Sequence, residues 1–286
     1  MGLNTRDTIQ VYVFILIQRG TNIFFGTRFH KFLRLPALLP VAIQSRKYLR
    51  KRTIPELEQI RYDREFVYRY FESQFRFRSP YWLWRHNHYF KLGSRGFGEP
   101  AFHSAWYAVL KHYRPRRLLE IGVYRGQVLS LWSLIGKQLD FPVEVTGLSP
   151  FENIGDEVSS YKNLDFVADI ESHYEYFGLP DPLLVKMSST SECAKSVIEH
   201  GKWDLVYIDG SHNLPDVISD YESALTGLSD SGVLVLDDSS LYLDQRLHPG
   251  RFSGHPGPSE VCQNRAIPEM DWFLSVGHLN FFRKRQ

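Results

Sequence analysis

Short apolar runs alternate with longer stretches of helical spacing from about residue 101 onward. The runs cover 118–121, 143–148, 183–187, 205–208 and 233–236, each about the length of a strand buried on both faces. Ala105, Val109 and Tyr113 recur every four residues, which predicts a helix over 101–113. Further helices are predicted over 126–139, 191–200 and 215–228. Such alternation predicts an open, mostly parallel sheet.

The last two apolar runs, 272–276 and 279–282, are split by Gly277 and His278 and predict a closing hairpin. The fold class is therefore α/β, with a doubly wound, mostly parallel seven-stranded sheet of the Rossmann-like kind. In this architecture ligands bind beyond the carboxyl ends of the strands. The residues that follow each strand are thus the first candidates for function.

The first 98 residues have a different character and predict a helical N-terminal extension, with the α/β domain over 99–286. Residues 1–52 hold ten Lys or Arg and a single acid, Asp7, whereas the remainder holds 24 basic and 31 acidic residues. Aromatic and Leu residues recur at helical intervals within this basic segment. The segment is interpreted as an arm that docks on the domain or on a second subunit, or as a peripheral membrane contact. No nucleic-acid-binding motif accompanies the charge, so no nucleic-acid partner is expected.

The composition is that of a folded protein, with 43% hydrophobic and 15% aromatic residues. Two cysteines, Cys193 and Cys262, provide neither a disulfide framework nor a metal-ligand cluster, which favours a reducing, cytoplasmic compartment. The sequence is also compatible with a peripheral location at the inner face of a membrane and with assembly into a homo-oligomer. The apolar run 9–17 is nine residues long, too short for a membrane-spanning helix of about 20 residues.

The loop after the first predicted strand carries candidate cofactor-binding chemistry. Glu120 stands at the end of the strand, and Gly122 and Gly126 follow before a helix. A dinucleotide-binding fingerprint would need glycine at positions 124 and 127, where this chain has Tyr124 and Gln127. An acid beside a glycine turn fits a smaller cofactor with a positive ammonium group, although an ordinary strand-to-helix turn remains the alternative.

The run Glu-Ile-Gly-Val-Tyr-Arg-Gly at 120–126 resembles the first motif of class I S-adenosylmethionine (SAM) methyltransferases. The resemblance spans 99–286 and is closest to the branch with macrolide-sugar O-methyltransferases and cephalosporin-hydroxylase-like proteins. It implies that the loop contacts the methionine end of SAM and that polar residues after the second and third strands hold its nucleoside. The residues implied are Glu120, Gly122, Val123, Tyr124, Gly126, Ser149, Ser188, Ser189 and Asp209.

Two of these positions depart from the family pattern. The family usually has an acid after the second strand, which holds the ribose hydroxyls, and this chain has Ser149. It usually has Gly-Asp-Ser after the third strand, where this chain has Met187, Ser188 and Ser189. A serine can hydrogen-bond a ribose, but without the strength of a charged acceptor.

Acidic residues follow the fourth and fifth strands. Asp209 is followed by Gly-Ser-His212, and Asp237 and Asp238 come after the next strand. If these strands are neighbours, three carboxylates converge, and such carboxylates repel one another unless they are protonated or bridged by a cation. Oxygen ligands suit Mg²⁺, Mn²⁺ or Ca²⁺. Roles in loop or turn hydrogen bonds, and a surface position for His212, are the alternatives.

The pattern Asp-Gly-x-His at 209–212, followed by Asp237 and Asp238 after the next strand, resembles the pattern of the metal-dependent members of that methyltransferase branch. The resemblance implies that Asp209, Asp237 and Asp238 bind Mg²⁺ or another divalent cation, and that His212, with Asp209, is catalytic. The predicted function is therefore SAM-dependent methyl transfer to a hydroxyl of a small molecule or sugar. A non-catalytic cofactor-binding or membrane-docking module is the alternative. An iron-dependent hydroxylase is disfavoured, because such sites use two histidines and a carboxylate and only His212 accompanies these acids.

The stretch 239–268 is rich in Gly, Pro and His and predicts a long irregular segment beside the acidic residues. It is interpreted as a substrate lid, with His248, Arg251 and His255 as candidate acceptor contacts.

Overall fold

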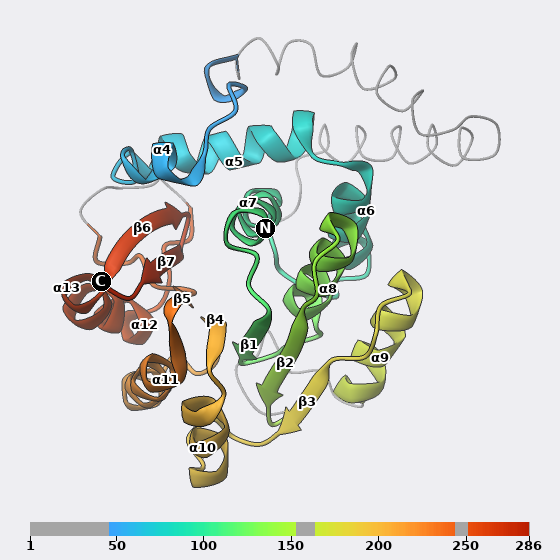
Figure 1. Cartoon of the computed structure of the whole chain (residues 1–286), viewed down its shortest axis with the longest axis vertical. Helices are drawn as coiled ribbons and strands as arrows, with labels where there is room; N and C mark the ends of the chain where they lie inside the picture. Colours follow the sequence, from blue (N-terminus) through green and yellow to red (C-terminus); the bar gives the residue numbers. More distant parts are fainter. Residues whose placement is uncertain (1–45, 153–163, 244–250, 286) are drawn as a thin grey trace. The chain divides into compact units, whose positions relative to one another are not determined.

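The computed structural model describes residues 46–152, 164–243 and 251–285 (Figure 1). The chain divides into two compact units, Met1–Lys47 and Tyr48–Gln286. The basic arm and its membrane contact were predicted for residues 1–52 and so fall almost wholly outside the described residues, as does part of the lid, 244–250. Among the helices of the described ranges, none is long and apolar enough to span a membrane.

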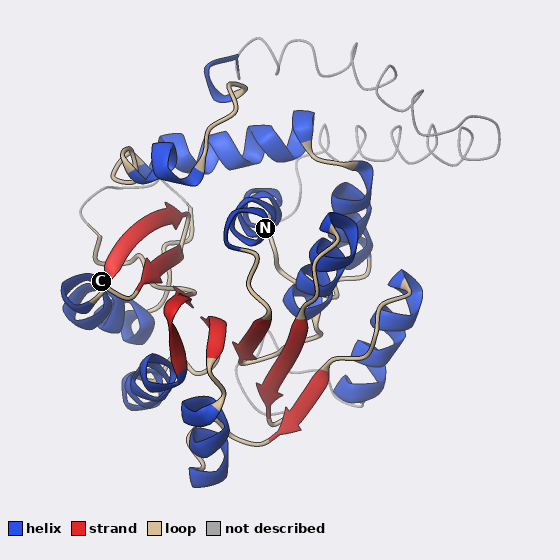
Figure 2. Cartoon of the chain, in the orientation of Figure 1, coloured by secondary structure: helices blue, strands red, loops and turns tan. Residues whose placement is uncertain are grey.

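A single seven-stranded sheet forms the centre of the second unit, in the order β3-β2-β1-β4-β5-β7-β6 (Figure 2). Strands β1 to β5 pair in parallel, and β7 runs antiparallel to both β5 and β6. This confirms the predicted doubly wound sheet with its closing hairpin. The strands are β1 (Arg117–Ile121), β2 (Glu144–Ser149), β3 (Leu183–Lys186), β4 (Trp203–Ile208), β5 (Leu228–Leu236), β6 (Asp271–Val276) and β7 (Leu279–Arg283).

Helices precede the sheet and connect its strands. Before β1 lie η1 (Arg46–Tyr48), α4 (Ile54–Glu58), α5 (Arg64–Arg78), α6 (Tyr81–Leu92) and α7 (Pro100–Tyr113). Between the strands lie α8 (Gln127–Leu139), α9 (Phe166–Phe177), α10 (Glu192–His200) and α11 (Leu214–Gly227). After β5 lie α12 (Pro256–Val261), the π-helical η2 (Cys262–Ala266) and α13 (Ile267–Glu269).

Alternating side chains of each central strand divide between two apolar layers. In β4, Leu205 and Tyr207 face the layer that contains α5, α7, α8 and α9, whereas Val206 and Ile208 face the layer that contains α10, α11 and α12. Both faces of the sheet are therefore covered, as the unbroken apolar runs of these strands predict. The rim at the carboxyl ends of the strands is left to carry polar side chains.

The helices before β1 pack into the same compact unit as the sheet. Arg64 of α5 is buried, and its guanidinium donates to Ser275 Oγ (3.1 Å) and to the carbonyl oxygen of Gly277 (2.6 Å) in the β6–β7 hairpin. Buried aromatic residues of α5 belong to the same apolar layer as the buried residues of α7, α8 and α9. The boundary predicted at residue 98 stays a prediction, but the part of the extension from Tyr48 onward folds with the sheet.

The predicted irregular segment 239–268 is wrong in its second half, where α12, η2 and α13 form one helical stretch from Pro256 to Glu269. The segment has two prolines early in α12, at 256 and 258, and proline is tolerated in the first turn of a helix because the amide there needs no intrahelical acceptor. Its role as a lid stays a prediction.

Candidate active site

The carboxyl ends of β1, β4 and β5 lie side by side in the sheet. Ile121 pairs with Ile208, which pairs with Leu236. The ladder continues one residue further, because the amide of Asp209 donates to the Ile121 carbonyl (2.8 Å) and that of Asp237 to the Ile208 carbonyl (3.0 Å). The register therefore brings Asp209 and Asp237 to one rim.

A buried tyrosine lies between these two carboxylates. The Tyr207 hydroxyl is 3.0 Å from Asp209 Oδ2 and 2.5 Å from Asp237 Oδ2. Burial, reinforced by the charges of Asp237, Asp238 and Glu120, raises the pKa of Asp209 well above its usual range. One hydroxyl has only one proton to donate, so both contacts are satisfied when Asp209 is protonated and donates to the tyrosine oxygen.

Asp238 is the centre of a histidine cluster. Its Oδ2 lies 3.2 Å from His212 Nε2 and 3.7 Å from His255 Nε2, and its Oδ1 lies 3.0 Å from His278 Nδ1. Burial opposes ionisation of this carboxyl, but hydrogen bonds from His212 and His278 outweigh it and hold its pKa well below the usual range. Asp238 is therefore an anion over the whole physiological pH range.

His278 supplies a positive charge to the acidic rim. It lies in the turn between β6 and β7, and its Nδ1 is 2.7 Å from Asp237 Oδ1. Burial lowers its affinity for a proton, but the neighbouring Asp237 and Asp238 outweigh burial and raise its pKa to about 10. His278 is thus an imidazolium at neutral pH and cannot accept a proton from a substrate.

The glycine turn after β1 packs directly against the acidic rim. Gly122 has φ +94°, and a Cβ on it would lie 2.1 Å from the carbonyl oxygen of Asp209. Only glycine fits where these two backbones meet. Gly126, with φ +70°, begins α8, and a Cβ there would meet Ile170 Cγ1 of α9 at 3.0 Å. Helix α9 therefore covers this end of the turn.

An ion pair fixes α9 over the turn. Arg125 donates to both carboxylate oxygens of Asp169, at 2.6 and 2.8 Å, and His173 Nε2 lies 3.2 Å from the same carboxylate. The ring of Tyr124 stacks on Phe97, with centroids 5.3 Å apart. Arg125 lies between the two glycines of the motif, but its partner Asp169 is 44 residues away in the sequence, so the motif alone did not predict this ion pair.

Glu120 lies deep beside the turn and is 3% exposed. Its Oε2 has no hydrogen-bond partner among the described residues. Burial, and to a smaller extent the nearby charge of Asp237, raises the pKa of Glu120 to about 8, against the backbone hydrogen bond at Leu129 that lowers it. A buried carboxyl oxygen that has no hydrogen-bond partner can pair with a positively charged ligand.

The three serines predicted to hold a nucleoside lie on the β3 side of the turn. Ser149 ends β2 and is buried. Ser188 is exposed, with its hydroxyl 3.0 Å from Thr190 Oγ1, and Ser189 follows it. Strand β1 lies between Ser149 and the acids after β4 and β5, and both β2 and β1 lie between those acids and the two serines that follow β3. The predicted cofactor residues thus extend along one rim, with the acid–histidine cluster at its far end.

A small pocket opens beside that cluster. It is lined by Ile208, Asp209, Gly210, Ser211, His212, Val217, Leu236, Asp237, Asp238 and Pro258. The three predicted metal ligands all line it. Their ligand atoms do not form one tight group, however: among the described residues, the groups with all ligand atoms within 4.8 Å are Asp237–Asp238–His278 and His212–Asp238–His255. The Tyr207 hydroxyl stands between Asp209 and Asp237.

Sequence reasoning did not find the roles of Tyr207 and His278, and gave His255 only a loose role as an acceptor contact. His278 had a partial signal, because the sequence predicts the hairpin turn that holds it, whereas the strand that this hairpin pairs with is known only from the structure. His278 occupies the turn of a hairpin whose second strand starts beside the end of β5, since Asn280 pairs with Leu236. A turn residue there must lie near Asp237. No comparable signal places His255.

Comparisons with known proteins agree with this architecture. Residues 119–239 match a family model described as a methyltransferase domain. No curated protein sequence matches the chain. A methyltransferase of Podospora anserina, solved with bound S-adenosylhomocysteine, has 17% identity and a TM-score of 0.51, with 73% of this chain and 89% of that chain covered.

Two bacterial structures align less closely. An O-methyltransferase of Bacillus cereus has 16% identity and a TM-score of 0.47, covering 72% of this chain and 92% of that chain. A provisionally assigned caffeoyl-CoA O-methyltransferase of Staphylococcus aureus has 10% identity and a TM-score of 0.40, covering 54% of this chain; the chain spans 64% of its length.

Proposed function

We propose that this chain transfers the methyl group of SAM to a hydroxyl of a small molecule or sugar, because residues 119–239 match a family model described as a methyltransferase domain. One observation carries the proposal. The glycine turn with its buried acid, Glu120, meets the backbone of Asp209 at the rim where the acid–histidine cluster lies. The residues that we propose for cofactor binding and for proton acceptance therefore share one edge of the sheet.

The glycine turn and its surroundings form the cofactor side of the proposed site. Glu120 pairs with the ammonium group of SAM, and the backbone of 122–126 passes beside the methionine part. Ser149, Ser188 and Ser189 face the nucleoside. SAM supplies an electrophilic methyl group, so the protein contributes mainly positioning and exclusion of water.

His212 is the proposed proton acceptor for the substrate hydroxyl. Asp238 lies 3.2 Å from its Nε2 and is anionic, so it orients the imidazole and stabilises the positive charge that proton transfer creates. Asp209 lines the same pocket. His278 is unsuited to this role because its neighbours keep it protonated.

A divalent cation such as Mg²⁺ would be held by Asp209, Asp237 and Asp238, and would lower the pKa of a coordinated hydroxyl. The carboxylates fit this role chemically, since burial and mutual repulsion leave Asp209 with a strongly raised pKa that a cation would relieve. Binding would require Tyr207 and His278 to give up contacts to Asp237.

The test is a methyl-transfer assay with isotope-labelled SAM and a panel of sugar, glycoside and phenolic acceptors. We expect His212→Ala to lower kcat on the order of 100-fold or more and to remove the acid limb of the pH–rate profile. We expect Asp209→Asn to abolish stimulation by Mg²⁺ while SAM still binds. His200→Ala, an exposed histidine on α10, is the matched control. Tight SAM binding with no product from any acceptor would instead favour a non-catalytic module.

A further inference from the structure

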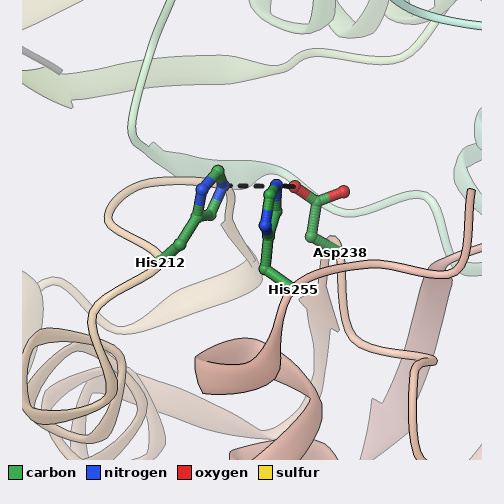
Figure 3. A group of neighbouring side chains, drawn as sticks. All are labelled: His212, Asp238 and His255. Atoms are coloured by element: carbon green, nitrogen blue, oxygen red, sulfur yellow. Dashed lines mark ion pairs between the residues drawn. The ribbon is translucent and has the colours of Figure 1, made fainter. Parts of the chain in front are cut away.

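We propose that His212, Asp238 and His255 form a binding site for a divalent transition metal of the zinc class. Figure 3 shows the two imidazoles facing each other with the carboxylate beside them. Their ring centroids are 3.8 Å apart at an interplanar angle of 17°. One nitrogen from each ring and one oxygen of Asp238 all lie within 4.8 Å of one another.

The three side chains come from three separate segments. His212 follows β4, Asp238 follows β5, and His255 immediately precedes α12. The backbone amide of His255 donates to the Asp238 carbonyl at 2.8 Å, and a bridge pairs Ser239 with Gly254. The second histidine is therefore held beside the carboxylate by main-chain contacts, independently of any contact between the side chains.

Two glycines on either side of His255 permit this approach. A Cβ at Gly254, which has φ +115°, would lie 2.0 Å from the Asp238 carbonyl oxygen. A Cβ at Gly257 would lie 2.2 Å from the His212 carbonyl oxygen. The backbone around His255 therefore packs directly against the backbone of Asp238 and His212, with no side chain between them. Such preorganisation lowers the cost of assembling a metal site.

A neighbouring hydrogen bond orients the carboxylate. His278 lies 3.0 Å from Asp238 Oδ1, which leaves Oδ2 turned toward His212 and His255. Metal-ligating carboxylates are commonly oriented in this way by partners that do not touch the ion. His278 is therefore a positioning residue for this site and not a ligand of it.

The donor set selects the class of ion. Two imidazole nitrogens and one carboxylate suit Zn²⁺, Co²⁺ and Fe²⁺, whereas Mg²⁺ prefers oxygen ligands and keeps several waters. The three side chains are 33%, 15% and 39% exposed, so an ion can enter and water can complete its coordination. This set differs from the predicted Mg²⁺ ligands, with which it shares only Asp238.

One consequence rests on the proposed function. An ion bound between His212 and Asp238 replaces the hydrogen bond by which Asp238 orients this imidazole, and its positive charge opposes protonation of the ring, so it disables the proposed proton acceptor. Zinc should therefore inhibit methyl transfer, and inhibition should be lost in a variant that has lost the second histidine. Zinc binding without inhibition would leave the metal site standing and would remove His212 from the role of proton acceptor.

The experiment is isothermal titration of the full chain with ZnCl₂ at pH 7.5, without SAM. We expect binding of one ion per chain that a thousandfold excess of MgCl₂ does not displace. His255→Ala should weaken it at least tenfold, and Asp238→Asn likewise; asparagine is the replacement of choice because it tolerates the positive φ of +50° at this position. Titration with CoCl₂ should give visible d–d absorption that His255→Ala removes.

The matched control is His200→Ala, which removes an exposed histidine distant in sequence from all three ligands. Far-ultraviolet circular dichroism of each variant confirms that it is folded. Zinc affinity that is unchanged in both His255→Ala and Asp238→Asn, or displacement of zinc by Mg²⁺, would overturn the proposal.

Discussion

If Glu120 pairs with the ammonium group of SAM, as we propose, SAM binding depends on pH. With a pKa of about 8, this carboxyl is about 90% protonated at pH 7 in the free protein. It must ionise to pair with the ammonium group of the cofactor, so binding releases close to one proton at pH 7. Since the folded pKa is raised, protonation competes with binding below pH 8 and ceases to compete above it.

The expected magnitude follows from this competition. The Kd of SAM should fall about tenfold per pH unit between pH 6 and 7, which is about 1.4 kcal/mol per unit, and should pass through a minimum near pH 8, because the α-amino group of SAM loses its own proton above about that pH. Titration calorimetry at pH 7 in two buffers of different ionisation enthalpy measures the released proton directly. Fluorescence or calorimetric titrations across pH 6–9 give the slope.

Two variants separate this effect from others. Glu120→Gln keeps the side-chain shape but cannot ionise, so it should weaken binding at pH 8 and abolish the pH slope. Glu171→Gln, on the exposed face of α9, should leave both unchanged. A Kd that does not vary between pH 6 and 8, with no proton released, would refute the assignment of Glu120 to the ammonium group.

Two further predictions concern stability. Burial lowers the pKa of His103, which is 1% exposed, to about 4, so the unfolded chain takes up a proton below pH 6.5 that the folded chain resists. The free energy of unfolding should therefore fall between pH 8 and 4.5 by about 2.5 kcal/mol more in the wild type than in His103→Gln, as urea titrations can measure; equal losses would refute this. Gly122→Ala should destabilise the fold by about 2 kcal/mol or more, because its Cβ would meet the Asp209 carbonyl at 2.1 Å and its φ is +94°. Gly178→Ala, with φ +59° and only Lys137 Nζ near at 3.6 Å, isolates the backbone strain; equal falls in Tm for both variants would contradict the close approach.

Much of the fold was predictable because it depends on local pattern. The run at 205–208 and its partners are apolar on both faces, which only a covered parallel sheet satisfies. The predicted helices over 126–139 and 215–228 match α8 and α11 to within one residue at each end. The run 233–236 predicted the buried end of β5 but not its start at Leu228, because the polar residues 229–231 that follow the buried Leu228 are partly or fully exposed.

The chain from 256 to 269 was not predicted as helical because its prolines and glycine have the composition of a loop. Proline disfavours helix in the interior but not in the first turn, and the position of a helix start depends on packing that a single sequence does not reveal. The same limit applies to α9, which packs against the glycine turn through Ile170.

The sequence by itself predicted that Asp209 and Asp237 leave at the same edge of the sheet, because residues directly after parallel strands emerge there. The pairing of β1 with β4 and of β4 with β5 decided that these strands are neighbours and that Glu120 lies beside the acids. Only the tertiary structure decided what surrounds them. His278 reaches Asp237 across 41 residues through an antiparallel hairpin, and His255 reaches Asp238 through glycine backbone contacts. These contacts depend on the pairing and close approach of distant segments, and no periodicity along the chain encodes them.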